Sequence, residues 1–332
     1  MTSQELNNIF ESFSHLKALI IGDVMVDAYL WGNVDRISPE APVPVVSVTK
    51  KEHRLGGAAN VVLNVQALGA TPIVCSVIGN DENGQLFLDL LKKRNLSSKG
   101  IIQSESRKTT VKTRVIGGNQ QMLRVDQEIE EEITLDEANQ LFERISEIIS
   151  KENIDVIIFQ DYDKGIITSD LIEKVAGFAK LNNIPVAADP KKKNFLNYKG
   201  ISLFKPNLKE LKEGLNVDLD IGNENEFHEA IEKFKQQQGI EAVMVTLSSK
   251  GIFVSNAESQ IVIPAHPRDV ADVSGAGDTV ISVAALCLAL NLPSVFTAKL
   301  ANLAGGQVCE KVGVVPIDQE LLKKEATQLL SE

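Results

Sequence analysis

Apolar residues along the chain follow two different periods. Short runs rich in β-branched residues are separated by segments of ten or more residues in which apolar positions recur every three or four. The first pattern is typical of buried strands and the second of amphipathic helices. We predict strands at residues 17–26, 73–78, 155–159, 184–188, 201–204 and 242–247, and helices at residues 58–68, 83–93, 136–150, 169–181 and 225–238. Because strands and helices alternate, we expect an α/β fold, with a doubly wound, mostly parallel sheet covered by helices on both faces.

Two stretches of the chain break this alternation. Residues 29–53 contain three prolines and a strand-like segment, and residues 109–126 form two short predicted strands around a turn at Gly117-Gly118-Asn119. Proline cannot donate to a central ladder, so such strands belong at an edge or in a separate small sheet. We therefore expect one domain over residues 1–332, with a small β-sheet that stands off the main body as a discontinuous lid.

The predicted lid has more apolar side chains than such a small sheet can bury. They are Leu30, Trp31, Val43, Val45, Val111, Val115 and Met122. Two or three strands are marginal in water by themselves, and open strand edges invite pairing. In one arrangement the lids of two copies pack on each other, which gives a homodimer. In the alternative, the lid closes over a ligand and buries this face within one subunit.

Composition limits the partners of the protein. The net charge of -11 and the pI near 5.0 repel phosphate backbones and anionic membranes, so we expect neither nucleic acid nor a membrane as a partner. Three cysteines stand far apart in apolar stretches, without a disulfide or metal spacing, which is typical of a reduced, cytoplasmic protein. The apolar run at residues 280–290 is too short to span a bilayer, and the N-terminus has no signal-peptide pattern.

The strongest chemical signal is residues 272–279 (DVSGAGDT), which lead directly into an apolar helix. A glycine-rich turn at a helix start leaves N–H groups unpaired at the positive end of the helix dipole, so Gly275, Ala276 and Gly277 form a predicted anion hole. Asp278 lies beside it, where a carboxylate can take a proton from a hydroxyl that attacks a phosphoryl group. These features predict a kinase with Asp278 as its base. The alternative is an ordinary helix start with a first-turn carboxylate.

Polar and glycine residues near the first strand suit a second ligand. Gly56 and Gly57 precede a helix and would let a ligand approach the backbone, with Asn60 one turn further in. Asp23 and Asp27 stand at the end of the first strand, where open α/β sheets bind ligands, and could accept bonds from sugar hydroxyls. Tight packing between helix and strand explains the glycines equally well.

Asn207 and Glu210 stand three residues apart at the start of a helix that follows a predicted strand, so both face the same way. An amide and a carboxylate in this place suit water-mediated binding of Mg²⁺ or of phosphate, since Mg²⁺ keeps several waters and takes few protein ligands. The alternative is a capping box, in which the two side chains only satisfy the first amides of the helix.

Charged residues also follow later strands and occupy the lid. Asp161, Lys164 and Asp189 come after two of the predicted strands. The basic residues of the lid are Arg36, Lys112, Arg114 and Arg124. On an acidic protein, such cations could receive a substrate phosphate through charge-assisted bonds. The alternative is that they are solvated positions on strand faces.

Together these segments resemble the ribokinase-like (PfkB-type) carbohydrate kinases. The likeness rests on residues 56–60 (GGAAN) and 272–278 (DVSGAGD), and it covers essentially the whole chain. It implies a ribokinase-like fold that uses ATP and Mg²⁺, and it leaves a requirement for a monovalent cation open. It implies sugar binding by Asp27, Gly56, Gly57 and Asn60, nucleotide binding by Asn207, Thr246, Ser248, Gly251 and Asn302, and metal binding by Asn207 and Glu210.

A narrower resemblance is to the heptose 7-phosphate kinases. It rests on residues 36–45 (RISPEAPVPV), 119–121 (NQQ), 161–165 (DYDKG), 189–191 (DPK) and 277–281 (GDTVI). It implies phosphoryl transfer from ATP to the anomeric C1 hydroxyl of D-glycero-β-D-manno-heptose 7-phosphate. The substrate contacts that it implies are Arg36, Arg114, Gln121, Arg124, Asp161 and Lys164. Many such chains continue into a nucleotidyltransferase domain; this sequence has no H-x-G-H motif, so we expect a separate nucleotidyltransferase to act downstream, towards the ADP-heptose used for lipopolysaccharide.

Three positions depart from these family patterns. Val283 stands where glycine or alanine is expected, Ser248 where glycine is common, and Lys205 where threonine is frequent. None of these departures removes a predicted catalytic group. The alternatives are a kinase of another sugar, such as fructose 1-phosphate or ribose, and a catalytically silent sugar-binding regulator. The presence of Asp278 and of Asn207-x-x-Glu210 argues against the regulator.

Overall fold

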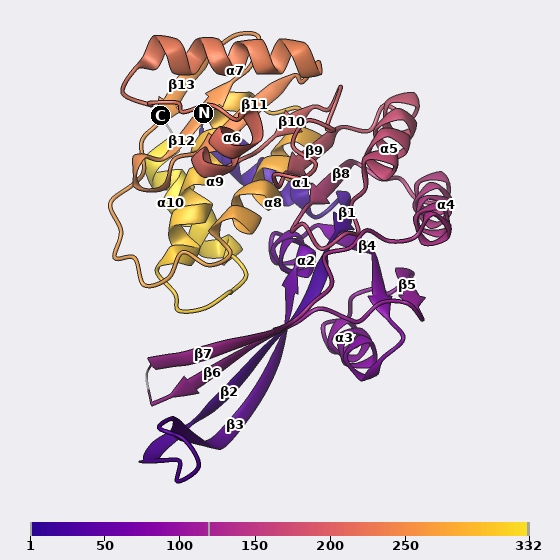
Figure 1. Ribbon diagram of the computed structural model, residues 1–332. Helices are drawn as coiled ribbons and strands as arrows, with labels where there is room; N and C mark the ends of the chain where they lie inside the picture. Colours follow the sequence, from indigo (N-terminus) through magenta and orange to yellow (C-terminus); the bar gives the residue numbers. More distant parts are fainter. Residues whose placement is uncertain (1, 119, 331–332) are drawn as a thin grey trace.

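The structure is a computed structural model that describes residues 2–118 and 120–330. Figure 1 shows an α/β body from which a long β-ribbon projects. The body contains a nine-stranded sheet of order β13-β12-β11-β10-β9-β8-β1-β4-β5, and the ribbon is a four-stranded sheet of order β3-β2-β6-β7. The predicted architecture, a mostly parallel sheet with helices and a second small β-sheet, is confirmed.

The large sheet is parallel from β5 to β11 and ends in an antiparallel pair of strands at one edge. Its strands are β1 (Lys17–Gly22), β4 (Thr71–Gly79), β5 (Gly100–Ser104), β8 (Val156–Gln160), β9 (Val186–Asp189), β10 (Leu203–Phe204), β11 (Ala242–Thr246), β12 (Ile252–Ser255) and β13 (Gln260–Ile263). The sequence pattern did not predict β5, β12 or β13. The two outermost strands, β5 and β13, are only partly buried and so lack a continuous apolar run.

Helices cover both faces of this sheet. They are α1 (Ser3–Phe13), α2 (Ala58–Ala67), α3 (Glu82–Lys93), α4 (Leu135–Lys151), α5 (Ser169–Leu181), α6 (Leu208–Leu215), α7 (Glu224–Gln238), α8 (Ala276–Ala289), α9 (Ser294–Cys309) and α10 (Gln319–Leu330). Strand β1 shows why two layers are needed, because successive side chains of a strand point to opposite faces. Its residues Ala18 and Ile20 pack in the core with α2, α8 and α9, whereas Leu19 and Ile21 pack in the core with α4, α5 and α7.

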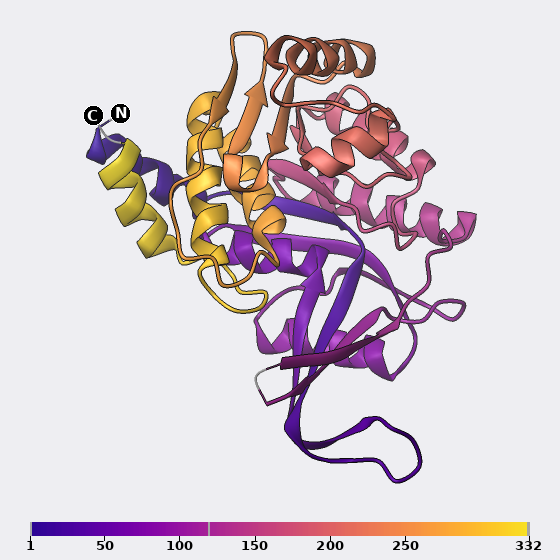
Figure 2. The same cartoon turned by 60° about the vertical axis from the view of Figure 1, so that its left-hand side comes forward.

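The ribbon, hereafter the lid, consists of β2 (Val24–Ile37), β3 (Pro44–Gly57), β6 (Val111–Gly117) and β7 (Gln120–Gln127). Its strands leave the body together and extend away from it, as Figures 1 and 2 show from two sides. The single strand predicted at residues 17–26 is wrong, because the chain passes at Asp23 from the large sheet into the small one. The lid therefore begins at Val24 rather than at residue 29. Of the predicted turn between β6 and β7, Asn119 lies outside the described residues.

The two faces of the lid differ in chemistry. Strand pairing places Leu30, Val115 and Leu123 on one face, and Tyr29, Arg114 and Arg124 on the other. The apolar side chains are unevenly covered: Val43 is 51% exposed, Met122 38% and Leu123 50%. Val111 is 8% exposed and packs into the core of the body. The prediction that Val111 is one of the apolar side chains left uncovered in the lid was therefore wrong. Trp31 stacks on Tyr29, with ring centroids 6.1 Å apart, and so belongs to the charged face.

The cysteines are free, as predicted. Burial raises the pKa of the Cys75 and Cys287 thiols to about 12, so both stay protonated at neutral pH. Among the residues that the structure describes, no helix is both long enough and apolar enough to cross a membrane.

Candidate active site

The glycine-rich segment forms the start of α8. Gly275 is the N-cap residue with φ 84°, a conformation that favours glycine, and no side chain caps the helix. A Cβ atom at this position would also lie 3.0 Å from Nδ2 of Asn60. The N–H of Ala276 donates a long bond of 3.3 Å to the carbonyl of Val273. Within the described chain, the unpaired donors of the predicted anion hole are therefore those of Gly275 and Gly277 rather than all three.

Asp278 is the buried carboxylate of this helix start, with 6% of its surface exposed. Its Oδ2 accepts a bond from Asn60 Nδ2 (2.7 Å), and its Oδ1 accepts bonds from the Tyr162 hydroxyl (2.6 Å) and Gln160 Nε2 (3.2 Å). Burial raises the pKa of Asp278 to about 6, although the bonds from Asn60 and Tyr162 lower it. A carboxylate with this pKa is ionised at neutral pH and still accepts a proton readily, as a general base must.

Two of the three donors to Asp278 were missed by the sequence reasoning, which assigned Asn60 to the sugar and gave no role to Gln160 or Tyr162. Gln160 is the last residue of β8, and Tyr162 follows it in the loop. Their position at the carboxyl end of a parallel strand is the signal that could have found them. The structure therefore places three donors around one carboxylate and fixes its orientation.

A buried ion pair lies next to the anion hole. Lys205 Nζ is 2.9 Å from Asp189 Oδ2, and both side chains are almost fully buried. A Cβ atom on Gly277 would lie 3.6 Å from Lys205 Nζ and 3.8 Å from Asp189 Oδ2, so the pair borders the first turn of α8. Lys205 is one of the departures from the family pattern, and here its ammonium group, paired with Asp189, lies beside the unpaired amides.

All five residues predicted to bind nucleotide line one cavity of about 1050 Å³. They are Asn207, Thr246, Ser248, Gly251 and Asn302. The cavity reaches Ala276 and Gly277, so it ends at the anion hole. Ser248 has φ 55°, a left-handed conformation that favours glycine, in line with the glycine that the family resemblance leads us to expect there. A cavity of this size lies at the upper limit of the usual range for small-molecule and cofactor sites.

Asn207 and Glu210 form a complete capping box at the start of α6. Asn207 Oδ1 accepts a bond from the Glu210 N–H, Glu210 Oε2 accepts one from the Asn207 N–H, and Glu210 Oε1 contacts Lys191. Asn207 and Glu210 thus cap the helix, as the alternative interpretation of this motif predicted. Asn223 and Glu226 repeat the same spacing at the start of α7 as an exposed cap, so the spacing alone does not identify a metal site.

The residues predicted to bind the sugar gather where the lid joins the body. Gly56 lies against Asp27, because a Cβ atom there would come within 2.1 Å of Asp27 Oδ2. Gly57 has φ 60° and its Cβ would clash with the Asp23 carbonyl at 2.3 Å. These glycines are therefore compatible with both predictions, tight packing of the backbone and close approach of a ligand. Asn60, one turn further along α2, is bonded to Asp278 as described above.

Two of the strand-end carboxylates have structural partners. Asp23 accepts bonds from the N–H groups of Tyr162, Lys164 and Ile166, so it holds the loop after β8 and is not available to a sugar. The suggestion that Asp23 accepts sugar hydroxyls was wrong for this reason. Asp161 is 1% exposed, and burial together with the nearby Asp23 raises its pKa to about 7. Its Oδ2 accepts bonds from Asn194 and Tyr198, while its substrate role stays a prediction.

The structure does not bring every predicted substrate residue to Asp278. Arg36 and Gln121 are exposed on the outer part of the lid. Arg36 stands nine positions beyond Asp27 along β2, a span of about 30 Å at the usual strand rise. It can approach a sugar site only if the lid bends or a second copy supplies it.

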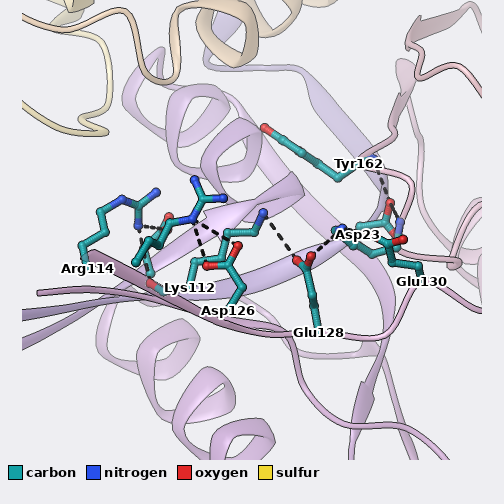
Figure 3. Close-up of polar contacts among 10 residues, drawn as sticks. Asp23, Lys112, Arg114, Asp126, Glu128, Glu130 and Tyr162 are labelled. Atoms are coloured by element: carbon teal, nitrogen blue, oxygen red, sulfur yellow. Dashed lines mark hydrogen bonds and ion pairs between the residues drawn. The ribbon is translucent and has the colours of Figure 1, made fainter. Parts of the chain in front are cut away.

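At the base of the lid, the predicted cations are already paired with carboxylates (Figure 3). The ion pairs are Arg114 with Asp27 (2.5 Å), Arg124 with Asp126 (2.9 Å), Lys112 with Glu128 (3.5 Å), and Lys164 with Glu128 (2.9 Å) and Glu130 (2.6 Å). Lys164 comes from the body and the others from the lid or from the segment that follows β7. The site thus joins charges from both parts of the molecule.

A cavity large enough for a nucleotide ends at an anion hole, next to a carboxylate whose pKa is about 6. This combination defines the class of small-molecule kinases. The family model described as "pfkB family carbohydrate kinase" matches residues 16–320. The chain belongs to this family of carbohydrate kinases and is an ATP-dependent sugar kinase.

Curated relatives are named "Bifunctional protein HldE". The protein from Geobacter sulfurreducens is 39% identical over 313 residues, which are 93% of this chain and 63% of the relative. The protein from Sulfurimonas denitrificans is 39% identical over 96% of this chain and 66% of the relative. The chain therefore spans about 63% of the length of the first of these relatives.

Solved structures with the same fold are more distant in sequence. Phosphofructokinase-2 from Escherichia coli in complex with potassium matches with a TM-score of 0.77 and 19% identity, over 96% of this chain and 99% of that one. Ribokinase from Arabidopsis thaliana, complexed with ribose and ATP, matches with a TM-score of 0.70 and 17% identity, over 93% and 99% of the two chains. These matches support the ribokinase-like fold.

Proposed function

We propose that this chain phosphorylates the anomeric C1 hydroxyl of D-glycero-β-D-manno-heptose 7-phosphate with ATP. The observation that carries the proposal is the meeting of the cavity, the anion hole and Asp278 at the start of α8. The similarity to HldE proteins over nearly the whole chain supports the heptose, and the cations at the lid base support a phosphorylated acceptor. A nucleotidyltransferase activity would then use the product in the cytoplasm.

The chemistry follows from the positions of these groups. The nucleotide occupies the cavity with its γ-phosphoryl group towards Gly275 and Gly277. Asp278 takes the proton of the C1 hydroxyl as its oxygen bonds to phosphorus and the bond to the ADP oxygen breaks. The amides of the anion hole and the nearby Lys205 stabilise the negative charge on the transferred group. Asn60, Gln160 and Tyr162 hold the carboxylate in place.

The donor set beside the cavity fits Mg²⁺ bound through water. Asn207 lines the cavity, and the carboxylate of Glu210 accepts a bond from the Asn207 N–H (2.8 Å), close to Lys191 and Asp189. One buried oxygen, Asp189 Oδ1, has no hydrogen-bond partner within the described residues. A hydrated Mg²⁺ would satisfy such oxygens and neutralise the ATP phosphates.

Replacing Glu210 by glutamine should raise the Mg²⁺ concentration for half-maximal rate by about tenfold, the lower bound for losing a group that orients a metal's ligands. The matched control is Glu226→Gln, which removes the same charge from the exposed Asn223 cap of α7. Thermal unfolding of both variants measures the loss of the cap itself. An unchanged Mg²⁺ dependence in Glu210→Gln would mean that the pair is only a helix cap.

We also propose that the apolar face of the lid makes a homodimer. Leu30, Val115 and Leu123 share that face, and a two-fold arrangement would bury both copies together. Light scattering should give twice the mass of 36.2 kDa at micromolar concentration. Leu123→Asp should restore the monomer, whereas Leu181→Asp, at an exposed position on α5, should not. A native mass of one chain would rule the dimer out and leave closure over substrate within one subunit.

The acceptor is tested by a coupled ADP-release screen over sugars and sugar phosphates. The heptose 7-phosphate should give the highest kcat/KM, above fructose 1-phosphate, ribose and the unphosphorylated heptose. Running each reaction with and without K⁺ tests the monovalent-cation requirement in the same experiment. A higher kcat/KM for fructose 1-phosphate or ribose would reassign the substrate. If no acceptor supports ADP release, a sugar-binding regulator would be favoured.

A further inference from the structure

The cations at the lid base carry no free positive charge in this structure. Lys112, Arg114, Arg124 and Lys164 each have a carboxylate within ion-pair distance, and Figure 3 labels both members of the Lys112–Glu128 pair. A phosphate dianion that enters this cluster meets those carboxylates beside every cation, and like charges repel each other. Binding of a phosphorylated acceptor therefore requires at least one carboxylate to leave.

Glu128 is the carboxylate that bridges the two parts of the molecule. Its Oε2 is 3.5 Å from Lys112 Nζ in the lid, and its Oε1 is 2.9 Å from Lys164 Nζ in the body. The three side chains are between 11% and 22% exposed, so water and salt screen the bridge only in part. A phosphate group offers several oxygens and can span the same two ammonium groups.

The segment that carries Glu128 has other anchors on the body. The Glu131 carbonyl accepts a bond of 2.9 Å from Arg107, Glu132 pairs with Lys193 at 3.0 Å, and the Ile133 N–H donates to the Gly165 carbonyl at 2.9 Å. These contacts do not involve the Glu128 side chain. Glu128 can therefore leave its two lysines while the residues that follow it stay attached.

We propose that Glu128 is an internal stand-in for the acceptor's phosphate, and thus a specificity-determining residue. In the free enzyme its carboxylate occupies the subsite between Lys112 and Lys164. The acceptor's phosphate displaces it and takes over both lysines, one from the lid and one from the body. A sugar without a phosphate lacks the anion that displaces Glu128. This inference rests on the proposed function, because it supposes a phosphorylated acceptor.

Calorimetric titration with inorganic phosphate, without ATP or sugar, tests directly whether Glu128 occupies the phosphate subsite. Glu128→Gln should bind phosphate at least about tenfold more tightly than the unchanged protein, because apparent affinity falls with the fraction of subsites that are already occupied. Glu130→Gln is the matched control: it removes the same charge beside Lys164, but Glu130 is 70% exposed and forms an ion pair with no second cation among the described residues. Its effect should stay below about twofold, as for an exposed ion pair.

Equal or weaker phosphate binding by Glu128→Gln would overturn the inference. Glu128→Ala gives a second test if the glutamine variant fails to fold, as judged by thermal unfolding. With a phosphorylated acceptor, Glu128→Gln should lower KM while kcat stays within about twofold, a split that a purely structural role would not produce. The phosphate titration and the acceptor screen fail independently, so a wrong acceptor and a wrong role for Glu128 are distinguishable.

Discussion

Replacing Asp278 by asparagine should lower kcat by about 10²–10⁴-fold, the contribution of a positioned general base. The change keeps the shape of the side chain and removes the oxygen that takes the proton. Affinity for ATP should change little, because the cavity is lined by Ala276 and Gly277 and not by Asp278. Steady-state kinetics with a saturating acceptor measure kcat, and equilibrium titration with nucleotide measures binding.

The control for this prediction is Asp170→Asn. Asp170 is also an aspartate in the first turn of a helix, α5, but it is half-exposed and paired with Lys174. Its replacement removes the same interaction with the helix dipole and should leave kcat unchanged. The pH profile gives a second readout: kcat/KM should rise as the pH passes through about 6, where Asp278 loses its proton. A near-native kcat in Asp278→Asn would refute the assignment of the base.

Replacing Lys164 by methionine should abolish the preference for a phosphorylated acceptor. Lys164 Nζ lies at the junction of lid and body, 11% exposed, and donates to two carboxylates that a phosphate could replace. Hydrogen bonds to charged groups contribute about 1.5–3 kcal/mol each, so kcat/KM for the phosphorylated acceptor should fall by about tenfold to a hundredfold. The value for the unphosphorylated sugar should hardly change. Comparing the two acceptors in each variant separates this effect from a general loss of activity.

Lys193→Met is the matched control for Lys164→Met. Lys193 pairs with Glu132, in the same segment after β7, and its side chain is more exposed than that of Lys164. It should keep the ratio of kcat/KM for the two acceptors. If the wild-type enzyme has the same kcat/KM for the phosphorylated and the unphosphorylated sugar, the enzyme does not recognise the acceptor's phosphate.

The sequence predicted the layers of the body because apolar periodicity reports burial directly. It could not predict where the lid begins, since apolar side chains occupy residues 18–21 and 24–26, on both sides of Asp23. The break at Asp23 comes from tertiary bonds: its carboxylate accepts three amides from the loop after β8, more than a hundred residues later. No local pattern carries that information.

The candidate site was predictable where its residues are consecutive in the sequence. Residues 272–278 predict the position of the anion hole and of the proposed base, because a helix start fixes their relative positions. The donors to Asp278 were harder to find, because Asn60, Gln160 and Tyr162 come from three separate segments that only the fold brings together. The Asn207 motif shows the opposite problem, since its spacing recurs as a plain cap at Asn223.

The most direct test of the central claim is the identity of the product. The protein is incubated with ATP, Mg²⁺ and D-glycero-β-D-manno-heptose 7-phosphate, and the reaction is followed by ³¹P NMR. We expect a second phosphate ester, coupled to the anomeric proton, to form in step with ADP, and Asp278→Asn to suppress it. A phosphate ester at any other carbon, or no ester while another sugar is phosphorylated efficiently, would contradict the proposed reaction.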